Sequence, residues 1–271
     1  MTSGRRSASI PRAGLNDRDG KFQLSSLAES GFDPLGRTCR FMLTEEAHHM
    51  FVGDTGVGRI VQRTAEVMAA SRIENPDQVR DLGVIDLQTI QRYLNFHYSV
   101  TLDLFGSEVS SNAASFFTSG LKGRYHETKL QDDHVLTDLT YPLSEVADGR
   151  LADNARLRDD YIHEVQLGVD RWNRHIASAG LPDRLTLPHK AFHRAIGNFA
   201  GHFVDPDGRV LTEDEWHARR RNWLPSERDY AFVQSLMSGR VVEPGRFANW
   251  IAPPRSGVNN RPIDFEYVRF N

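Results

Sequence analysis

Residues 34–51 read PLGRTCRFMLTEEAHHMF, and this stretch decides the fold class that we expect. Proline at position 34 suits the first turn of a helix. Apolar residues follow at helical spacing, at Leu35, Cys39, Met42, Leu43 and Met50. The stretch is therefore predicted to be one helix of a helical bundle, and it carries a Glu with a His three residues later.

More helices are expected on either side of this stretch. Residues 21–30 show a helical apolar stripe that ends at Gly31, so this helix should pack antiparallel to the next one. Gly53, Gly56 and Gly58 are expected to loosen the chain before a further helix over residues 60–71.

Three further helices are predicted in the middle of the chain. Asp86 is a candidate N-cap for a helix that reaches Phe105. A weaker helix is expected over residues 109–121, and a long one over residues 154–179 that Gly180 closes.

The chain divides by composition into three parts. Residues 1–16 are rich in Arg and Ser and are expected to form a disordered leader. Residues 17–180 are expected to form a helical bundle, which makes the fold mainly α. Residues 181–271 are rich in Pro and Gly and are expected to form an irregular region packed on the bundle. Short apolar runs at 184–187 and 209–211 predict a few short strands there, and residues 205–208 predict a turn.

Charge and composition exclude several classes of protein. The 271 residues carry a formal net charge of −3, which gives no reason to expect nucleic acid or a membrane surface as partner. A single cysteine, Cys39, excludes an intramolecular disulfide and a Cys-rich metal cluster. No run of 18 apolar residues occurs, so no membrane span is expected, and the single cysteine favours a reducing cytoplasm.

The Glu and His pair in the first quoted helix is the best candidate for a metal site. Residues three apart share one face of a helix, so a Glu-x-x-His turn can direct a carboxylate and an imidazole at one metal. Ferritin-like di-iron bundles use such turns. Glu45 with His48 and Glu46 with His49 both have this spacing, but Glu46 and His49 lie nearer the apolar stripe that contains Met50. We therefore select Glu46 and His49.

Competing motifs are weaker. Asp160 and His163 have metal-ligand spacing, but they lie among charges typical of a solvated face. His189 and His193 lack a matched carboxylate motif, so packing, capping or substrate contact is the simpler interpretation. The glycines of residues 53–58 lack the Gly-Lys-Ser/Thr ending of a phosphate-binding loop, and we reject that interpretation.

Four blocks of the sequence resemble the component B family of benzoyl-CoA oxygenases, also called benzoyl-CoA 2,3-epoxidases. Residues 17–64 carry the longest block, DRDGKFQLSSLAESGFDPLGRTCRFMLTEEAHHMFVGDTGVGRIVQRT. The others are YLNFHYSVTLDLFGSE at 93–108, FFTSGLKGRYHE at 116–127 and NNRPIDFEYVRFN at 259–271. The resemblance covers nearly everything after the leader.

This resemblance implies a ferritin-like di-iron monooxygenase of aerobic benzoate degradation. Such an enzyme uses O2 to epoxidise the ring of benzoyl-CoA, and a separate reductase with NADPH, FAD and an iron–sulfur centre supplies electrons. Among the metal ligands, the resemblance implies Asp17, with Asp19 as the alternative, together with Glu46 and His49. For the phosphates of CoA, two clusters are candidates: Lys122, Arg124 and Lys129, or Arg219, Arg220 and Arg221.

Half of the family's ligand set has no counterpart in this sequence. Members of the family carry another carboxylate and another Glu-x-x-His turn before the aspartate, where this chain has only residues 1–16. We therefore expect a truncated or split form that binds iron poorly alone. Two alternatives stay open: an inactive fragment that binds a partner or substrate, and another kind of ferritin-like di-iron protein.

Overall fold

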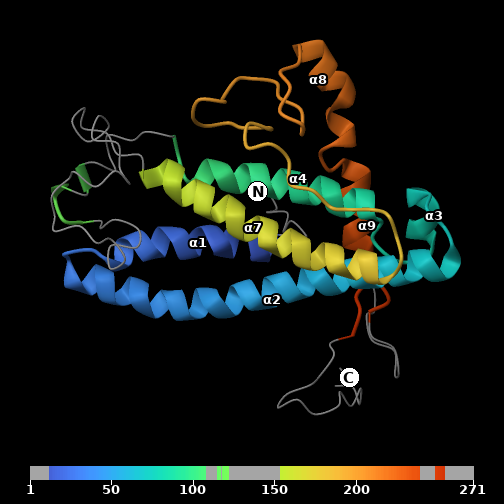
Figure 1. Cartoon of the computed structure of the whole chain (residues 1–271), viewed down its shortest axis with the longest axis horizontal. Helices are drawn as coiled ribbons and strands as arrows, with labels where there is room; N and C mark the ends of the chain where they lie inside the picture. Colours follow the sequence, from blue (N-terminus) through green and yellow to red (C-terminus); the bar gives the residue numbers. More distant parts are fainter. Residues whose placement is uncertain (1–11, 108–114, 117, 122–152, 239–247, 254–271) are drawn as a thin grey trace, which may run out of the picture.

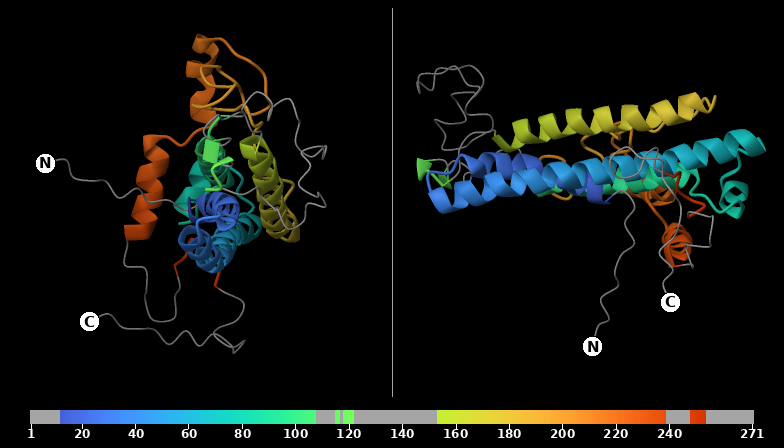
Figure 2. Two further views of the ribbon diagram at one scale, coloured as in Figure 1. Left: turned by 90° about the vertical axis from the view of Figure 1, so that its left-hand side faces the viewer. Right: turned by 90° about the horizontal axis from the view of Figure 1, so that it is seen from below.

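The computed structural model describes residues 12–107, 115–116, 118–121, 153–238 and 248–253, with only the backbone described for 12–17 and 153–156. Four long helices lie side by side in this part of the chain (Figures 1 and 2): α1 (Arg12–Ala28), α2 (Asp33–Ser71), α4 (Leu87–Leu104) and α7 (Asp153–Ser178). Shorter elements surround them: α3 (Pro76–Asp81), α8 (Glu213–Arg219), the 3-10 helix η2 (Arg220–Asn222) and α9 (Glu227–Ser238). The expectation of a mainly helical bundle is confirmed.

Helices α1 and α2 form an antiparallel hairpin, as the sequence predicts (Figure 1). The turn is tight because Gly36 lies close to the end of α1, where a Cβ would be 3.1 Å from the carbonyl oxygen of Ala28. Helix α1 begins at Arg12, so residues 12–16 are helical and do not belong to the leader expected there. No proline lies between Pro11 and Pro34, so the sequence allows a helix to begin earlier than the expected end of the leader.

Helix α2 is one continuous helix of 39 residues, which corrects the expectation of two helices separated by a loosened segment. Of the glycines in its middle, Gly58 packs against a neighbouring helix, whereas a Cβ on Gly56 would meet nothing within 4 Å. Gly58 faces α7, where a Cβ would lie 3.4 Å from Cδ1 of Trp172. The indole of Trp172 also donates a hydrogen bond to the backbone oxygen of Asp54, at 3.1 Å. Small residues therefore admit a large side chain from the neighbouring helix.

The predictions for α4 and α7 are confirmed. The side chain of Asp86 caps α4 by accepting a hydrogen bond from the Thr89 amide at 2.8 Å. Helix α7 ends just before Gly180, whose φ of +78° favours glycine. The core between α2, α4 and α7 is rich in aromatic side chains, and Tyr98, Tyr161 and Trp172 are at most 2% exposed.

The predicted short strands are wrong for the described part of the chain, which holds no sheet and only an isolated bridge between Val204 and Val210. Residues 184–187 instead receive their hydrogen bonds from side-chain amides. Gln91 pairs with both backbone groups of Thr186, at 2.9 and 2.7 Å. Asn173 pairs in the same way with Leu185, at 2.8 Å for each bond. Two amide side chains thus replace the neighbouring strand that this segment would need.

The irregular C-terminal region is attached to α4 by buried polar and aromatic contacts. Arg194, whose side chain is fully buried, donates to Asp103 of α4 at 2.6 Å. The ring of His193 stacks on Trp216 with centroids 5.9 Å apart, in a backbone conformation of φ 51°. The turn predicted at residues 205–208 is confirmed, since the Gly208 amide donates to the Asp205 carbonyl at 2.9 Å.

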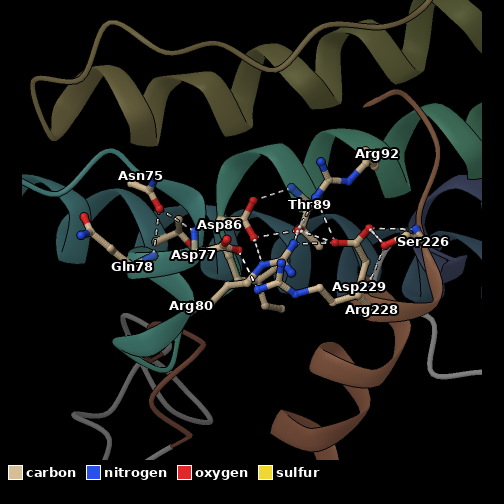
Figure 3. A network of polar contacts seen from close by, with 12 residues as sticks. Asn75, Asp77, Gln78, Arg80, Asp86, Thr89, Arg92, Ser226, Arg228 and Asp229 are labelled. Atoms are coloured by element: carbon tan, nitrogen blue, oxygen red, sulfur yellow. Dashed lines mark hydrogen bonds and ion pairs between the residues drawn. The ribbon is translucent and has the colours of Figure 1, made fainter. Parts of the chain in front are cut away.

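A buried ion-pair network attaches α9 to α3 and α4 (Figure 3). Arg80 contacts Asp86 at 2.6 Å and also pairs with Asp229, and both its partners are at most 3% exposed. Arg92 reaches Asp229 from α4 at 2.9 Å. Burial alone would raise the pKa of Asp229, but hydrogen bonds from Ser226, Arg92 and Arg80 outweigh it and hold that pKa well below its usual range.

The predicted helix over residues 109–121 lies largely outside the described residues, and so does the whole chain after Pro253. Across the described ranges, no helix is both long and apolar enough to cross a membrane.

Asp229→Asn is expected to lower the free energy of unfolding by about 3–5 kcal/mol, because it leaves the buried Arg80 and the partly buried Arg92 without their shared charge. Arg228→Met is the matched control, since it removes the exposed pair with Asp77 on the same two elements, at 3.0 Å. That change should cost less than about 1 kcal/mol. Urea unfolding followed by circular dichroism measures both, and equal losses would contradict the assignment of α9 attachment to the buried network.

Candidate metal site

The selected turn lies in the first half of α2, where α1 is the neighbouring helix (Figure 1). Nδ1 of His49 is 4.0 Å from Oε2 of Glu46, and the two side chains are 53% and 19% exposed. Glu45 and His48 are exposed residues. Of the two possible registers, Glu46 is therefore the one whose carboxylate is covered by the bundle.

The carboxylate of Glu46 lies directly against α1. A Cβ built on Gly20 would lie only 3.2 Å from Cδ and Oε1 of Glu46. The neighbouring residue Asp19 is 8% exposed, and Glu46 acts electrostatically on it. Gly20 thus lets the backbone of α1 approach closely enough for two acidic side chains from different helices to share one small buried region.

Asp19 is held in an unfavourable electrostatic setting. Burial raises its pKa from 3.8 to about 6, the Gln23 hydrogen bond opposes this, and Glu46 adds to the rise. Its Oδ1 atom is buried and has no hydrogen-bond partner. A buried carboxylate oxygen of this kind is suited to a cation or a proton. Asp17, the first choice from the sequence, is on α1, but its side chain lies outside the described residues, so its role stays a prediction.

The donors brought together have the chemistry that iron requires, because carboxylates and imidazole are its usual protein ligands. Asp19 and Glu46 contribute buried carboxylates and His49 contributes an adjacent ring. Among the residues whose side chains are described, however, no three His, Cys, Asp or Glu groups are close enough to hold a metal ion together. The residues therefore fit part of a metal site and not a complete one.

One neighbouring feature was not predicted from the sequence. Asp54, two helical turns after Glu46, pairs with Arg18 of α1 at 3.2 Å and with Arg171 of α7 at 2.7 Å. The spacing of Glu46, Met50 and Asp54 by four residues could have shown it, since all three share one helix face.

An open cavity of about 290 Å³ adjoins this feature. The cavity is lined by Arg18, Met50, Phe51, Asp54, Glu164, Leu167 and Arg171. Charged groups of α1 and α7 thus surround an apolar patch close to the candidate turn.

The other candidates from the sequence lie elsewhere. His163 is exposed on α7, which agrees with a solvated face. His189 accepts a hydrogen bond from the Ala191 amide at 3.2 Å, so it acts locally, as expected. Arg219, Arg220 and Arg221 are exposed at the end of α8 and on η2. Of the other basic cluster, Lys122, Arg124 and Lys129, all three lie outside the described residues.

Near the candidate turn, helix α2 also carries large apolar side chains that are exposed in the described part of the chain. Phe41 is 72% exposed, Phe51 69% and Val52 53%. These residues flank the Glu46 and His49 turn in the sequence. An uncovered apolar surface of this kind marks an interaction site.

The chain aligns over 266 residues, 95% of its length, with one characterised protein at 58% identity.

That relative is benzoyl-CoA oxygenase component B from Aromatoleum evansii. The chain spans about 56% of its length. No family model matches the sequence. The resemblance read from the sequence blocks is confirmed.

Asp19→Asn is expected to change how the stability of the metal-free chain depends on pH. The pKa of Asp19 is higher in the folded state, so its favourable contribution is present below pH 3.8 and is lost as pH rises through about 6. The variant should therefore be more stable than the wild type at pH 7.5, by about 1–2 kcal/mol, but not at pH 4.

Urea unfolding at several pH values in the presence of a chelator tests this expectation. Asp81→Asn, which changes an exposed acid on α3, serves as the control and should leave the pH profile unaltered. A wild-type profile that shows no loss of stability between pH 4 and 7 would contradict the burial of an unsatisfied acid at position 19.

Proposed function

We propose that this chain is the part of a di-iron oxygenase component that carries one aspartate and the Glu46–His49 turn, and that the whole component epoxidises benzoyl-CoA at the 2,3 position. The observation that carries the proposal is the buried acid pair of Asp19 and Glu46 beside His49. It occurs in a chain that is 58% identical to benzoyl-CoA oxygenase component B.

The proposed iron site needs more ligands than these three. A pair of bound iron ions supplies the redox chemistry that activates O2. Asp19 and Glu46 would hold the ions with their carboxylates, and His49 would add a neutral nitrogen ligand. A polypeptide equivalent to the rest of the relative would supply the other ligands and cover Phe41, Phe51 and Val52. Asp17 remains a candidate for the aspartate ligand alongside Asp19.

The partners follow from the same proposal. The word component in the relative's name implies a system of several proteins. We propose that a reductase with NADPH, FAD and an iron–sulfur centre delivers electrons to this component. Exposed arginines at positions 219–221 are available for the phosphates of the CoA part of the substrate.

A second function is favoured by one observation. Since the described side chains hold no three-ligand metal cluster, a chain acting alone would be a binding module for a partner or substrate without catalysis. Iron stoichiometry distinguishes the two: the chain alone should bind iron weakly, at well below two ions. Two tightly bound ions per chain would contradict the partial-site proposal.

Glu46→Gln is the variant that tests the proposed site directly. The wild-type chain, assembled with a polypeptide equal to the rest of the relative, should show benzoyl-CoA-dependent O2 uptake with NADPH and the reductase. Loss of one carboxylate ligand should lower this rate and the iron content at least tenfold.

Glu45→Gln is the matched control for the register of the turn, because Glu45 is the exposed neighbour with the same spacing to a histidine. The O2 uptake rate and the iron content of this variant should stay within about twofold of the wild-type values. A larger loss with Glu45→Gln than with Glu46→Gln would reverse the register, and an active assembly indifferent to both would overturn the site.

A further inference from the structure

An ion pair between Arg18 and Asp54 lies next to the acid pair of Asp19 and Glu46. Arg18 immediately precedes Asp19 on α1, and its side chain is 5% exposed. Its Nη2 atom lies 3.2 Å from Oδ1 of Asp54, which is 18% exposed. The pair therefore connects α1 to α2 at the residue next to the candidate ligand.

Helix α7 completes this junction. Gly168 packs so tightly on the pair that a Cβ there would lie 3.2 Å from both Nη2 of Arg18 and Oδ1 of Asp54. Arg171, one turn later on α7, donates to Oδ2 of Asp54 at 2.8 Å. Asp54 thus receives one arginine from each of two helices, and its position relative to both is fixed.

Such fixation matters because the two candidate aspartate ligands, Asp17 and Asp19, flank Arg18 on α1. A rotation of α1 by a fraction of the 100° between successive residues would move both positions relative to Glu46. Breaking a buried ion pair is costly, so Arg18 and Asp54 resist that rotation.

We propose that the Arg18–Asp54 pair, packed against Gly168, is a positioning pair that fixes the rotation of α1 and thereby places its candidate aspartate ligand relative to Glu46 for a metal ion. The inference rests on the proposed function, because it takes these carboxylates as metal ligands. The inference makes the metal affinity depend on Arg18, Asp54 and Gly168, none of which is a ligand.

The test is anaerobic titration with Co(II) of the chain assembled with a polypeptide equal to the rest of the relative, for the wild type and each variant, followed by visible absorption. Asp54→Asn keeps the size of the side chain and removes its charge, and should raise the Co(II) dissociation constant about tenfold while altering the absorption band. Arg18→Met should act in the same direction, and Arg18→Lys should restore part of the affinity.

The control variant is Lys21→Met. Lys21 pairs with Glu164, so this change also removes an ion pair between α1 and α7, but one whose side chains are 29% and 31% exposed. It should leave the Co(II) dissociation constant within about twofold of the wild-type value. If a general loosening of the α1–α7 contact were the cause, Lys21→Met and Asp54→Asn would raise the Co(II) dissociation constant equally. That result would overturn the proposal.

A second pair of variants separates positioning from folding. Gly168→Ala adds a methyl group at the ion pair and should weaken Co(II) binding. Gly58→Ala adds one at an ordinary contact distance, 3.4 Å from Trp172, and should not. Circular dichroism identifies any variant that fails to fold, and the remaining ones still decide the question.

The outcomes distinguish this inference from the proposed function. If the wild type binds Co(II) and Glu46→Gln does not, but Asp54→Asn and Gly168→Ala bind as the wild type does, the positioning pair is wrong and the metal site stands. If the wild type binds no Co(II), or Glu46→Gln binds it equally well, both are wrong.

Discussion

The close approach of α1 and α2 is the constraint on which the site depends. Glycines at positions 20 and 36 let the two backbones come together, and Gly168 lets α7 close over the same place. One consequence is a pair of carboxylates, Asp19 and Glu46, in a region where water cannot fully solvate them. The hairpin would be more stable with apolar residues there, so the acids indicate a function.

Much of the fold can be predicted from the sequence, because helical spacing and caps are local. The cap at Asp86 and the end at Gly180 are examples. The uninterrupted α2 could not be predicted, since Gly58 is explained by Trp172, more than a hundred residues away. The false strand at residues 184–187 has a similar cause, because its hydrogen-bond partners are the distant side chains of Gln91 and Asn173.

The candidate site could also be predicted only in part from the sequence. The Glu46 register follows from the helical stripe, and the structure places that carboxylate against α1. The choice between Asp17 and Asp19 depends on the rotation of α1, which no local pattern fixes. The helix face shared by Glu46, Met50 and Asp54 draws attention to Asp54, but no local pattern identifies Arg18, 36 positions earlier, as its partner. Asp19 lies within electrostatic reach of Glu46, whereas the side chain of Asp17 lies outside the described residues, so both aspartates stay candidates.

The central claim is that Asp19, Glu46 and His49 belong to one iron site. Anomalous X-ray diffraction at the iron edge, from crystals of the chain assembled with a polypeptide equal to the rest of its relative, tests this most directly. The account predicts iron bound by Glu46 and His49, with an aspartate of α1 as a further ligand. Iron at other residues, such as Asp160 and His163, or no ordered iron between α1 and α2, would contradict it.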